Sequence, residues 1–227
     1  MCRRIEAVIF DLDGTLLDTI DDIAEASNRV YGSRGLAPFS IEEMKRLVGE
    51  GAEELVRKVF AARGVPAPGD DKIAAILRDY RREYETVWRA HSRPYAGVPE
   101  LLSGLARSGV RTAVLSNKAQ MFTAVMVAEL FPAHHFDIVR GALPGVPLKP
   151  DPAPALAIAA ELGVAPAACA FVGDTSIDML TARAAGMCAV GARWGFRTAE
   201  ELRSSGADIL AASPTDILSL LQNGGQR

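Results

Sequence analysis

Residues 8–19 read VIFDLDGTLLDT, which is the most informative stretch of the sequence. The apolar run Ala7–Phe10 is short and ends at a polar turn, which is typical of a buried strand. We therefore expect Asp11 and Asp13 at the carboxyl end of that strand, the edge at which open α/β sheets bind ligands. Two carboxylates so close repel each other unless a cation lies between them, and oxygen ligands suit a hard ion such as Mg²⁺. An acidic turn at the surface is the ordinary alternative, and the stretch by itself does not exclude it.

The composition is that of a globular protein. The 227 residues are 49% hydrophobic and carry a net charge of −3, so the chain can build one large domain or two smaller ones. No basic stretch indicates nucleic acid, no apolar stretch is long enough for a membrane, and no signal peptide precedes the first strand. Cys2, Cys169 and Cys188 are odd in number and far apart, which favours free thiols in a reducing, cytoplasmic compartment.

Strand-like and helical runs alternate over most of the chain. After Ala7–Phe10, four more strand-like runs follow: Arg111–Leu115, Phe136–Val139, Ala170–Val172 and Ala189–Ala192. Helical segments at about 98–108, 119–130, 153–162 and 177–185 separate them or follow them. This order predicts an α/β fold with a doubly wound parallel sheet and helices on both faces.

Residues 20–92 interrupt this alternation and contain no convincing strand. Apolar residues at helical spacing indicate three helices there, and Ser40 with Glu43 forms a capping box before a fourth, short helix. The sequence therefore predicts a core domain made of residues 1–17 and 93–227, with a helical domain, 18–92, inserted into it.

Three further motifs place polar side chains after later strands. Ser116 follows an apolar run, and its hydroxyl, with neighbouring main-chain N–H groups, can bind a phosphoryl oxygen. Lys149 lies in a proline-bounded loop, where an ammonium can neutralise phosphate charge. Asp174 ends another strand and could complete a metal site, and Asp178 lies in the first turn of the next helix.

Each of these motifs has an ordinary structural alternative. Ser116 could cap the following helix, Lys149 could be a solvated surface lysine, and Asp178 could complement the helix dipole. Taken together, however, four strand ends would converge on one edge of one sheet with carboxylates, a hydroxyl and an ammonium. That set can bind Mg²⁺ and a phosphate and can supply a nucleophile.

These residues resemble the four motifs of the haloacid dehalogenase (HAD) superfamily, in the family's order: Asp11-Leu12-Asp13-Gly14-Thr15, Ser116, Lys149, and Gly173-Asp174 with Asp178. The resemblance covers essentially the whole chain and implies a Rossmann-like core. The inserted domain resembles the family's C1-type helical cap. Within the superfamily, the chain looks most like phosphoglycolate phosphatases and their pyrophosphatase relatives. Three segments carry that likeness: Leu47–Gly51, Trp194–Phe196 and Ala207–Pro214.

The resemblance implies a Mg²⁺-dependent phosphatase that forms an aspartyl-phosphate. Asp11 would attack phosphorus, and Asp13 would act as general acid and base. Asp11, Asp174 and the main-chain carbonyl of Asp13 would hold the metal. Asp178 would orient Lys149 or metal-bound water.

Further residues are expected to bind the substrate. Ser116, Asn117 and Lys149 would hold the phosphoryl oxygens. The cap would close over the site, with Gly49, Glu50 and Gly51 as the part most suited to reach a ligand. Arg193 and Arg197 could bind a carboxylate, or could be surface arginines. We expect a small phosphorylated metabolite, phosphoglycolate first, as the substrate, and a monomer or homodimer as the assembly.

Other activities remain open at this stage. A HAD pyrophosphatase shares these motifs. A sugar phosphomutase of the same cap class typically has histidine where this chain has Ile23, and usually valine in place of Thr15. From a different class, a phospho-accepting signalling module also uses an acidic metal site, a hydroxyl and a lysine. Such a module would be about half this length and would lack both the Asp-x-Asp pair and the cap.

Overall fold

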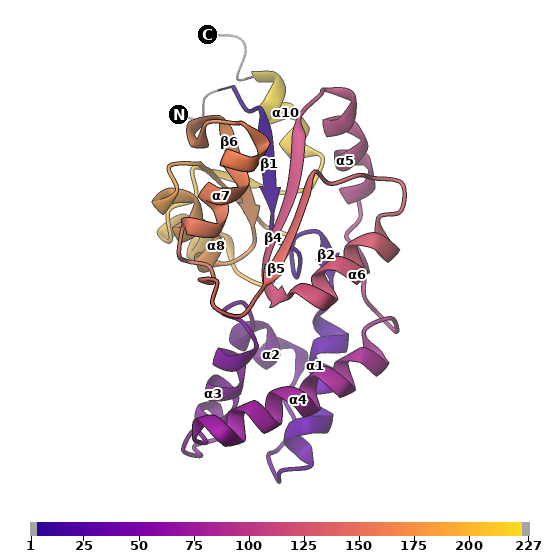
Figure 1. Cartoon of the computed structure of the whole chain (residues 1–227), viewed down its shortest axis with the longest axis vertical. Helices are drawn as coiled ribbons and strands as arrows, with labels where there is room; N and C mark the ends of the chain where they lie inside the picture. The colour runs from indigo at the N-terminus through magenta and orange to yellow at the C-terminus, as the bar shows by residue number, and fades with distance from the viewer. Residues whose placement is uncertain (1–3, 224–227) are drawn as a thin grey trace. The chain divides into compact units, whose positions relative to one another are not determined.

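The computed structural model describes residues 4–223, which divide into two compact units (Figure 1). The first unit is discontinuous in sequence: it takes in the chain up to Leu17 and again from Pro94 onward. The second unit is the intervening segment Asp18–Arg93. The short strands β2 (Leu17–Asp18) and β3 (Arg93–Pro94), where the chain passes between the units, pair with each other.

The first unit is built on a six-stranded parallel sheet of order β5-β4-β1-β6-β7-β8. Its strands are β1 (Ala7–Phe10), β4 (Arg111–Ala119), β5 (Ile138–Ala142), β6 (Cys169–Gly173), β7 (Cys188–Ala192) and β8 (Ile209–Ala211). The predicted α/β fold is confirmed. Because β1 lies between β4 and β6, where the strand order reverses, its carboxyl end is the edge at which such sheets bind ligands.

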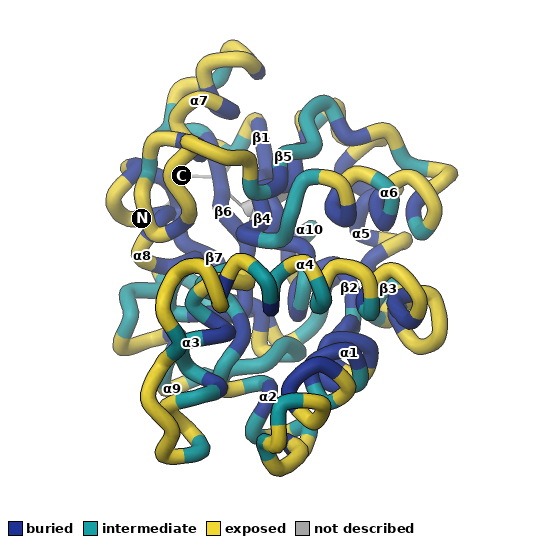
Figure 2. The backbone as a smooth tube through the Cα atoms, turned by 60° about the horizontal axis from the view of Figure 1, so that its bottom comes forward, coloured by how far each residue is buried: buried dark blue, intermediate teal, exposed yellow. Residues whose placement is uncertain are grey.

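Helices cover both faces of the sheet (Figure 1). One face carries α7 (Ala153–Leu162), α8 (Ser176–Ala184) and α9 (Ala199–Ser204), whose buried residues share one core cluster, and the other carries α5 (Val98–Arg107), α6 (Gln120–Leu130) and α10 (Asp216–Asn223). A short 3₁₀ turn, Pro166–Ala168, precedes β6. Alternate residues of β1 and β6, such as Ile9 and Phe171, pack against α7 and α8. All four residues of β1 are buried, as a strand covered on both faces requires (Figure 2).

The second unit contains four helices: α1 (Ile20–Gly32), α2 (Ile41–Leu47), α3 (Ala52–Ala62) and α4 (Asp70–Val87). Their apolar faces pack together, with Tyr31, Val56 and Tyr84 fully buried. The capping box predicted for α2 is confirmed. Ser40 Oγ accepts from the Glu43 main-chain N–H at 3.2 Å, and the Glu43 carboxylate accepts from the Ser40 main-chain N–H at 2.8 Å.

The bounds of β4 and β5 differ most from the prediction, while those of β6 and β7 differ by one residue. β5 begins at Ile138, not at Phe136, because the Phe136 ring packs edge-on against Phe131 in the turn that precedes the strand. β4 continues past Leu115 to Ala119, with a shift of register against β5 between those two residues. This irregular segment contains Ser116, and its consequence for the site is described below.

One cysteine prediction is wrong. Cys169 is a buried free thiol, as expected, but Cys188 is disulfide-bonded. Cys2 lies outside the described residues. Among the described helices, none has the length and apolar character needed to cross a membrane.

Candidate active site

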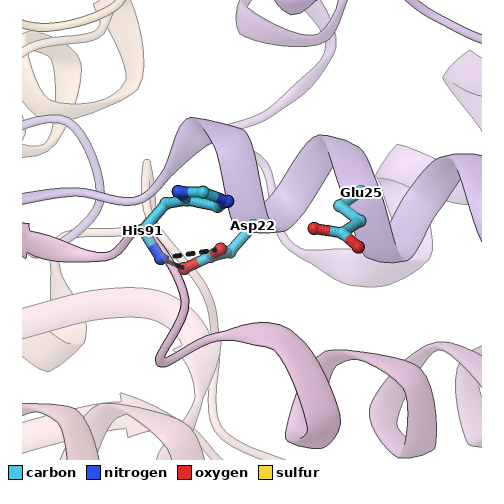
Figure 3. Close-up of side chains that lie close together, drawn as sticks. All are labelled: Asp22, Glu25 and His91. Atoms are coloured by element: carbon cyan, nitrogen blue, oxygen red, sulfur yellow. Dashed lines mark hydrogen bonds between the residues drawn. The ribbon is translucent and has the colours of Figure 1, made fainter.

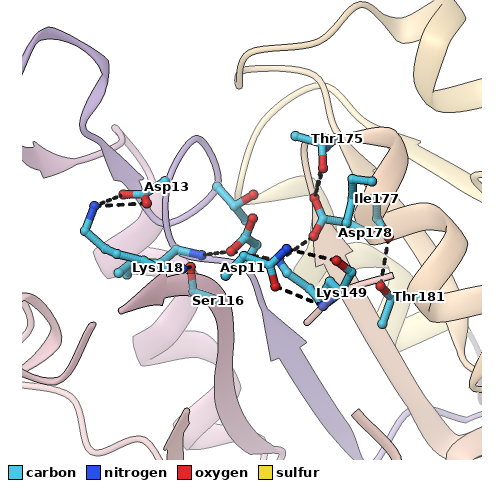
Figure 4. A network of polar contacts seen from close by, with 12 residues as sticks. Asp11, Asp13, Ser116, Lys118, Lys149, Thr175, Ile177, Asp178 and Thr181 are labelled. Atoms are coloured by element: carbon cyan, nitrogen blue, oxygen red, sulfur yellow. Dashed lines mark hydrogen bonds and ion pairs between the residues drawn. The ribbon is translucent and has the colours of Figure 1, made fainter. Parts of the chain in front are cut away.

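Asp11 stands directly after β1, at the centre of the polar network in Figure 4. The residue is only 6% exposed. Its Oδ1 atom accepts from the Leu12 main-chain N–H at 2.7 Å and lies 2.9 Å from Nζ of Lys149. The nucleophile expected from the sequence is therefore next to the lysine expected to bind phosphate.

Lys149 joins two carboxylates in the interior. Its Nζ lies 2.7 Å from Oδ1 of Asp178, in addition to its contact with Asp11, and the residue is 3% exposed. Lys149 is thus not the solvated surface lysine of the alternative interpretation. Asp178 also caps its own helix, because its Oδ2 accepts from the main-chain N–H and the hydroxyl of Thr175 at 3.0 and 2.7 Å. Asp178 therefore serves as the N-terminal acid of α8 and as a partner of Lys149.

The register shift between β4 and β5 includes two residues of the predicted site, Ser116 and Asn117. Leu115 pairs with Arg140 and Ala119 pairs with Ala142, so more residues lie on β4 than on β5 between these pairs. A bulge of this kind re-aims side chains. Ser116 lies in the bulge and is not the cap of α6, whose N-cap is Ala119.

Asn117, also in the bulge, holds the main chain of Lys149. Its Nδ2 donates to the Lys149 carbonyl oxygen at 3.0 Å, and its Oδ1 accepts from the Lys149 N–H at 2.9 Å. The Asn117 side chain is thus committed to this loop. A contact from this residue to phosphate would have to come from its main-chain N–H.

Lys118 is a site residue that the sequence reasoning missed. Its Nζ lies 3.0 Å from both carboxylate oxygens of Asp13, and its side chain is only 8% exposed (Figure 4). The only sequence signal was its position immediately after Ser116 and Asn117. Asp13 and Asp11 are two residues apart, yet they have different lysine partners.

Asp174, which follows β6, is fully buried, and the groups in the described part of the chain that donate hydrogen bonds to it are neutral. Thr15 Oγ1 donates to Oδ1 at 2.9 Å, and the Phe196 main-chain N–H donates to Oδ2 at 2.8 Å. In the described part of the chain, no lysine or arginine forms an ion pair with it. Thr15 and Phe196 were not assigned roles from the sequence.

The charges of this cluster fit a bound cation. Ligand atoms of Asp11, Asp174 and Asp178 lie within 4.8 Å of one another, and among residues 4–223 Lys149 is the one cation that pairs with them. Burial, with a smaller effect of the Asp178 charge, raises the pKa of Asp11 to about 7, although Lys149 opposes that shift. Burial, followed by the charges of Asp178 and Asp11, raises the pKa of Asp174 well above its usual value. A divalent ion bound by oxygen ligands would relieve this excess of negative charge.

The pKa of Lys149 is also raised, but for a lysine this favours the charged form. Burial by itself would lower the pKa of Lys149, but the charges of Asp11 and Asp178 outweigh burial and raise it. The ammonium is therefore held in its charged form, as a phosphate-binding role requires.

The residues expected to set specificity are not part of this network. Gly49, Glu50 and Gly51 belong to the helical unit, where Glu50 Oε1 lies 2.5 Å from Lys58 Nζ. In the core unit, Arg193 is exposed, and Arg197 Nε lies 3.3 Å from Oε1 of Glu201 in α9.

A second acidic cluster lies within the helical unit (Figure 3). Asp22 of α1 is fully buried, and its carboxylate accepts from the main-chain N–H groups of His91 and Ser92 at 2.7–3.1 Å and from the Ser92 hydroxyl at 2.7 Å. Glu25, nearby, pairs with Arg29. The Asp22 carboxylate therefore ties α1 to the segment before β3, and these donors account for its burial.

Comparison with known proteins agrees with this arrangement. A sequence profile of the haloacid dehalogenase-like hydrolases matches residues 8–192. A phosphoglycolate phosphatase of Nitrosospira multiformis is 32% identical over 96% of both chains. An N-acetylmuramic acid 6-phosphate phosphatase of Pseudomonas aeruginosa is 29% identical over 96% of this chain and 95% of its own length.

A solved structure extends the agreement to three dimensions. The crystal structure of a predicted phosphoglycolate phosphatase from Haemophilus somnus superposes with a TM-score of 0.87 at 26% identity, covering 96% of this chain and 98% of that one. The match therefore includes the sheet that carries the polar network as well as the helical unit. The chain is an enzyme of the haloacid dehalogenase-like hydrolase family, and its sequence resembles those of phosphoglycolate phosphatases.

Proposed function

We propose that this enzyme hydrolyses a small phosphate monoester in two steps, through an aspartyl-phosphate on Asp11. One observation carries the proposal: the Asp11 carboxylate lies 2.9 Å from the Lys149 ammonium and within 4.8 Å of ligand atoms of Asp174 and Asp178, at the strand edge where ligands bind. In this setting, one carboxylate can attack phosphorus while neighbouring groups compensate the charge that builds up.

In the first step, an oxygen of Asp11 forms a bond to phosphorus and the bond from phosphorus to the ester oxygen breaks. Asp13 donates a proton to the departing alkoxide. In the second step, Asp13 takes a proton from water while the water oxygen attacks phosphorus, and the Asp11 carboxylate is released with inorganic phosphate. Lys149 and Ser116 hold phosphoryl oxygens throughout, and Asn117 and Asp178 keep Lys149 in place.

The acidic cluster would hold Mg²⁺ through Asp11, Asp174 and the main-chain carbonyl of Asp13. When bound, Mg²⁺ would stabilise the negative charge that develops on the transferred phosphoryl group. Both oxygens of Asp178 already have protein partners, so its role would be to support Lys149 rather than to bind the ion.

The role of Asp13 predicts a dependence on the leaving group. Asp13→Asn removes the general acid, which is worth on the order of 10²–10⁴-fold. Nitrophenolate needs little protonation, so single-turnover phosphorylation should slow much less with nitrophenyl phosphate than with an alkyl phosphate. An equal loss of rate with the two substrates would contradict this role.

The proposed substrate is a two- or three-carbon phosphate ester that carries a second anionic group, with phosphoglycolate first. Relatives named for phosphoglycolate and for N-acetylmuramic acid 6-phosphate support an anionic ester, and they differ in the size of the ester. Arg193 and Arg197, with Gly49, Glu50 and Gly51 of the helical unit, are the residues proposed to distinguish substrates.

A substrate panel tests this proposal. We expect kcat/KM at equal Mg²⁺ to be higher for phosphoglycolate than for pyrophosphate, glucose phosphates and nucleotides. A hexose phosphate or a nucleotide that exceeds phosphoglycolate about tenfold, which corresponds to about 1.4 kcal/mol of transition-state binding, would overturn the small-substrate proposal. Preferential hydrolysis of pyrophosphate would instead identify a pyrophosphatase.

A further inference from the structure

The loop that follows β7 contacts the site, although its residues belong to none of the four sequence motifs. Its residues Trp194, Gly195 and Phe196 are called the Trp194 loop below. Trp194 Nε1 donates to the carbonyl oxygen of Thr15 at 2.9 Å, and the Phe196 main-chain N–H donates to Oδ2 of Asp174 at 2.8 Å. The Trp194 loop thus joins the turn after Asp13 to the acidic residue after β6.

Gly195 brings the loop backbone against Asp174. A Cβ atom at Gly195 would lie 2.2 Å from Cβ of Asp174 and 2.5 Å from its Oδ2, and 2.3 Å from the carbonyl oxygen of Gly14. Separations below 3.0 Å do not occur in real structures, so only glycine permits this approach. Two of these three neighbours belong to Asp174 itself, and the third belongs to the turn that carries Asp13.

Gly14 approaches Asp174 from another side. A Cβ atom at Gly14, whose φ is +82°, would lie 2.3 Å from Oδ2 of Asp174. Thr15 Oγ1 meanwhile donates to Oδ1. The carboxylate of Asp174 is therefore fixed by backbone contacts on two sides and by one hydrogen bond on each oxygen.

A purely structural role for Asp174 does not explain why its carboxylate is held so tightly. The residue is fully buried, its donors are all neutral, and no ion pair within residues 4–223 compensates its charge. Burying a carboxylate in this way is costly unless a cation joins it. The constraint is understandable if the orientation of the carboxylate matters for a metal ion.

We infer that the Trp194 loop positions Asp174 as a metal ligand and thereby sets the affinity of the enzyme for Mg²⁺. The inference rests on the proposed function, because it takes the acidic cluster to be the magnesium site. Residues that orient metal ligands typically change metal affinity about 10–100-fold when they are altered. Trp194, Gly195 and Phe196 are positioning residues in this account, and they do not contact the reacting atoms.

Gly195→Ala tests the inference, because the added methyl group must displace Asp174 or the Gly14 carbonyl. Calorimetric titration of the metal-free protein with Mg²⁺, without substrate, should show at least about tenfold weaker binding than in the wild type. The Mg²⁺ concentration for half-maximal activity should rise by a similar factor. KM for phosphoglycolate at saturating Mg²⁺ should change by less than about threefold, which separates loss of metal binding from general damage to the site.

Two further variants keep the test decisive. Gly32→Ala is the matched control, because its added Cβ would meet nothing within 4 Å, and it should leave Mg²⁺ affinity unchanged. If Gly195→Ala does not fold, Trp194→Phe provides the test, since it removes the indole N–H that donates to Thr15 and keeps an aromatic ring. This variant should weaken Mg²⁺ binding about threefold or more.

The outcomes separate this inference from the proposed function. Wild-type Mg²⁺ affinity in folded Gly195→Ala, or in Trp194→Phe when Gly195→Ala does not fold, overturns the positioning role and leaves the phosphatase proposal intact. A wild-type protein that hydrolyses phosphate esters but binds no Mg²⁺ overturns both the metal site and the inference.

Discussion

Asp11→Asn is expected to remove turnover of every phosphate ester, by about 10⁴-fold or more, because an amide oxygen is a poor nucleophile at phosphorus. The fold should persist. The substitution keeps the shape of the side chain and removes a carboxylate whose pKa burial has already raised to about 7. Steady-state kinetics with freshly purified protein, together with circular dichroism, measures both effects.

Two controls make the Asp11→Asn result interpretable. Asp71→Asn, at an exposed position of α4, should retain full activity after the same preparation. Mass spectrometry of the Asp11→Asn protein must exclude deamidation back to aspartate. Turnover within about tenfold of the wild type, in protein shown to contain asparagine, would remove Asp11 from the reaction.

Lys149→Met should have the second largest effect, on both activity and stability. The variant leaves Asp11 and Asp178 close together in the interior without their shared ammonium. Breaking a buried ion pair by removing one partner costs about 3–5 kcal/mol of unfolding free energy. Activity should fall by at least about 10³-fold, because the charge on the phosphoryl oxygens loses its lysine. Lys72→Met, at an exposed position of α4, is the matched control.

The stability loss of Lys149→Met should depend on pH in a definite direction. Burial raises the pKa of Asp11 from 3.8 to about 7, so folding favours the protonated form, and stability falls as pH rises from 3.8 to about 7 and then levels off. Removing the ammonium raises the pKa further, which makes the loss greater at pH 8 than at pH 5. Urea unfolding in EDTA at the two pH values measures it, and an equal loss at both would contradict the charge argument.

A double variant separates the stability effect of Lys149 from its catalytic effect. Adding Asp178→Asn to Lys149→Met removes one of the two unpaired carboxylates, so part of the stability at pH 8 should return. Activity should not return, because the phosphoryl oxygens still lack their lysine. Recovery of activity would show that Lys149 only neutralises Asp178.

The main elements of the fold could be predicted because their signals are local. Ala7–Phe10 is an apolar run that stops at a carboxylate, and the structure places β1 at those residues. The helix from Ala153 to Leu162 follows prolines and ends at Gly163, which has left-handed geometry. The predicted start of β5 is two residues too early because Phe136 is as apolar as a strand residue. Only the packing of Phe136 against Phe131 shows that it lies in the turn before the strand.

The polar network was predictable only in part, because some of its contacts depend on packing that leaves no local signal in the sequence. Asp11, Lys149 and Asp174 follow strands of one parallel sheet, so topology alone brings them to one edge. Lys118 gave no comparable signal, since its partner Asp13 lies 105 residues away and the contact depends on the bulge in β4. The contact of Phe196 with Asp174 is made by a main-chain N–H, which every residue except proline possesses.

The disulfide of Cys188 is a further case in which sequence spacing was insufficient. Three cysteines far apart in the sequence favoured free thiols. Spacing along the chain says little about distance in a doubly wound fold, where strands distant in sequence become neighbours in the sheet. β1 and β6 illustrate this, since they pair side by side, with Ala7 opposite Cys169, although β4 and β5 lie between them in the sequence.

Trapping the covalent intermediate distinguishes an aspartyl-phosphate on Asp11 from direct hydrolysis by water. Asp13→Asn should still be phosphorylated by nitrophenyl phosphate but should lose the base that activates water, so the phosphoenzyme accumulates. Rapid acid quenching followed by borohydride reduction converts phosphoaspartate to homoserine, which peptide mass spectrometry locates. We expect a burst of about one nitrophenolate per active site, as an accumulating covalent intermediate gives, with homoserine at position 11. Steady nitrophenolate release with Asp11 unmodified, or homoserine at any other position, would contradict this mechanism.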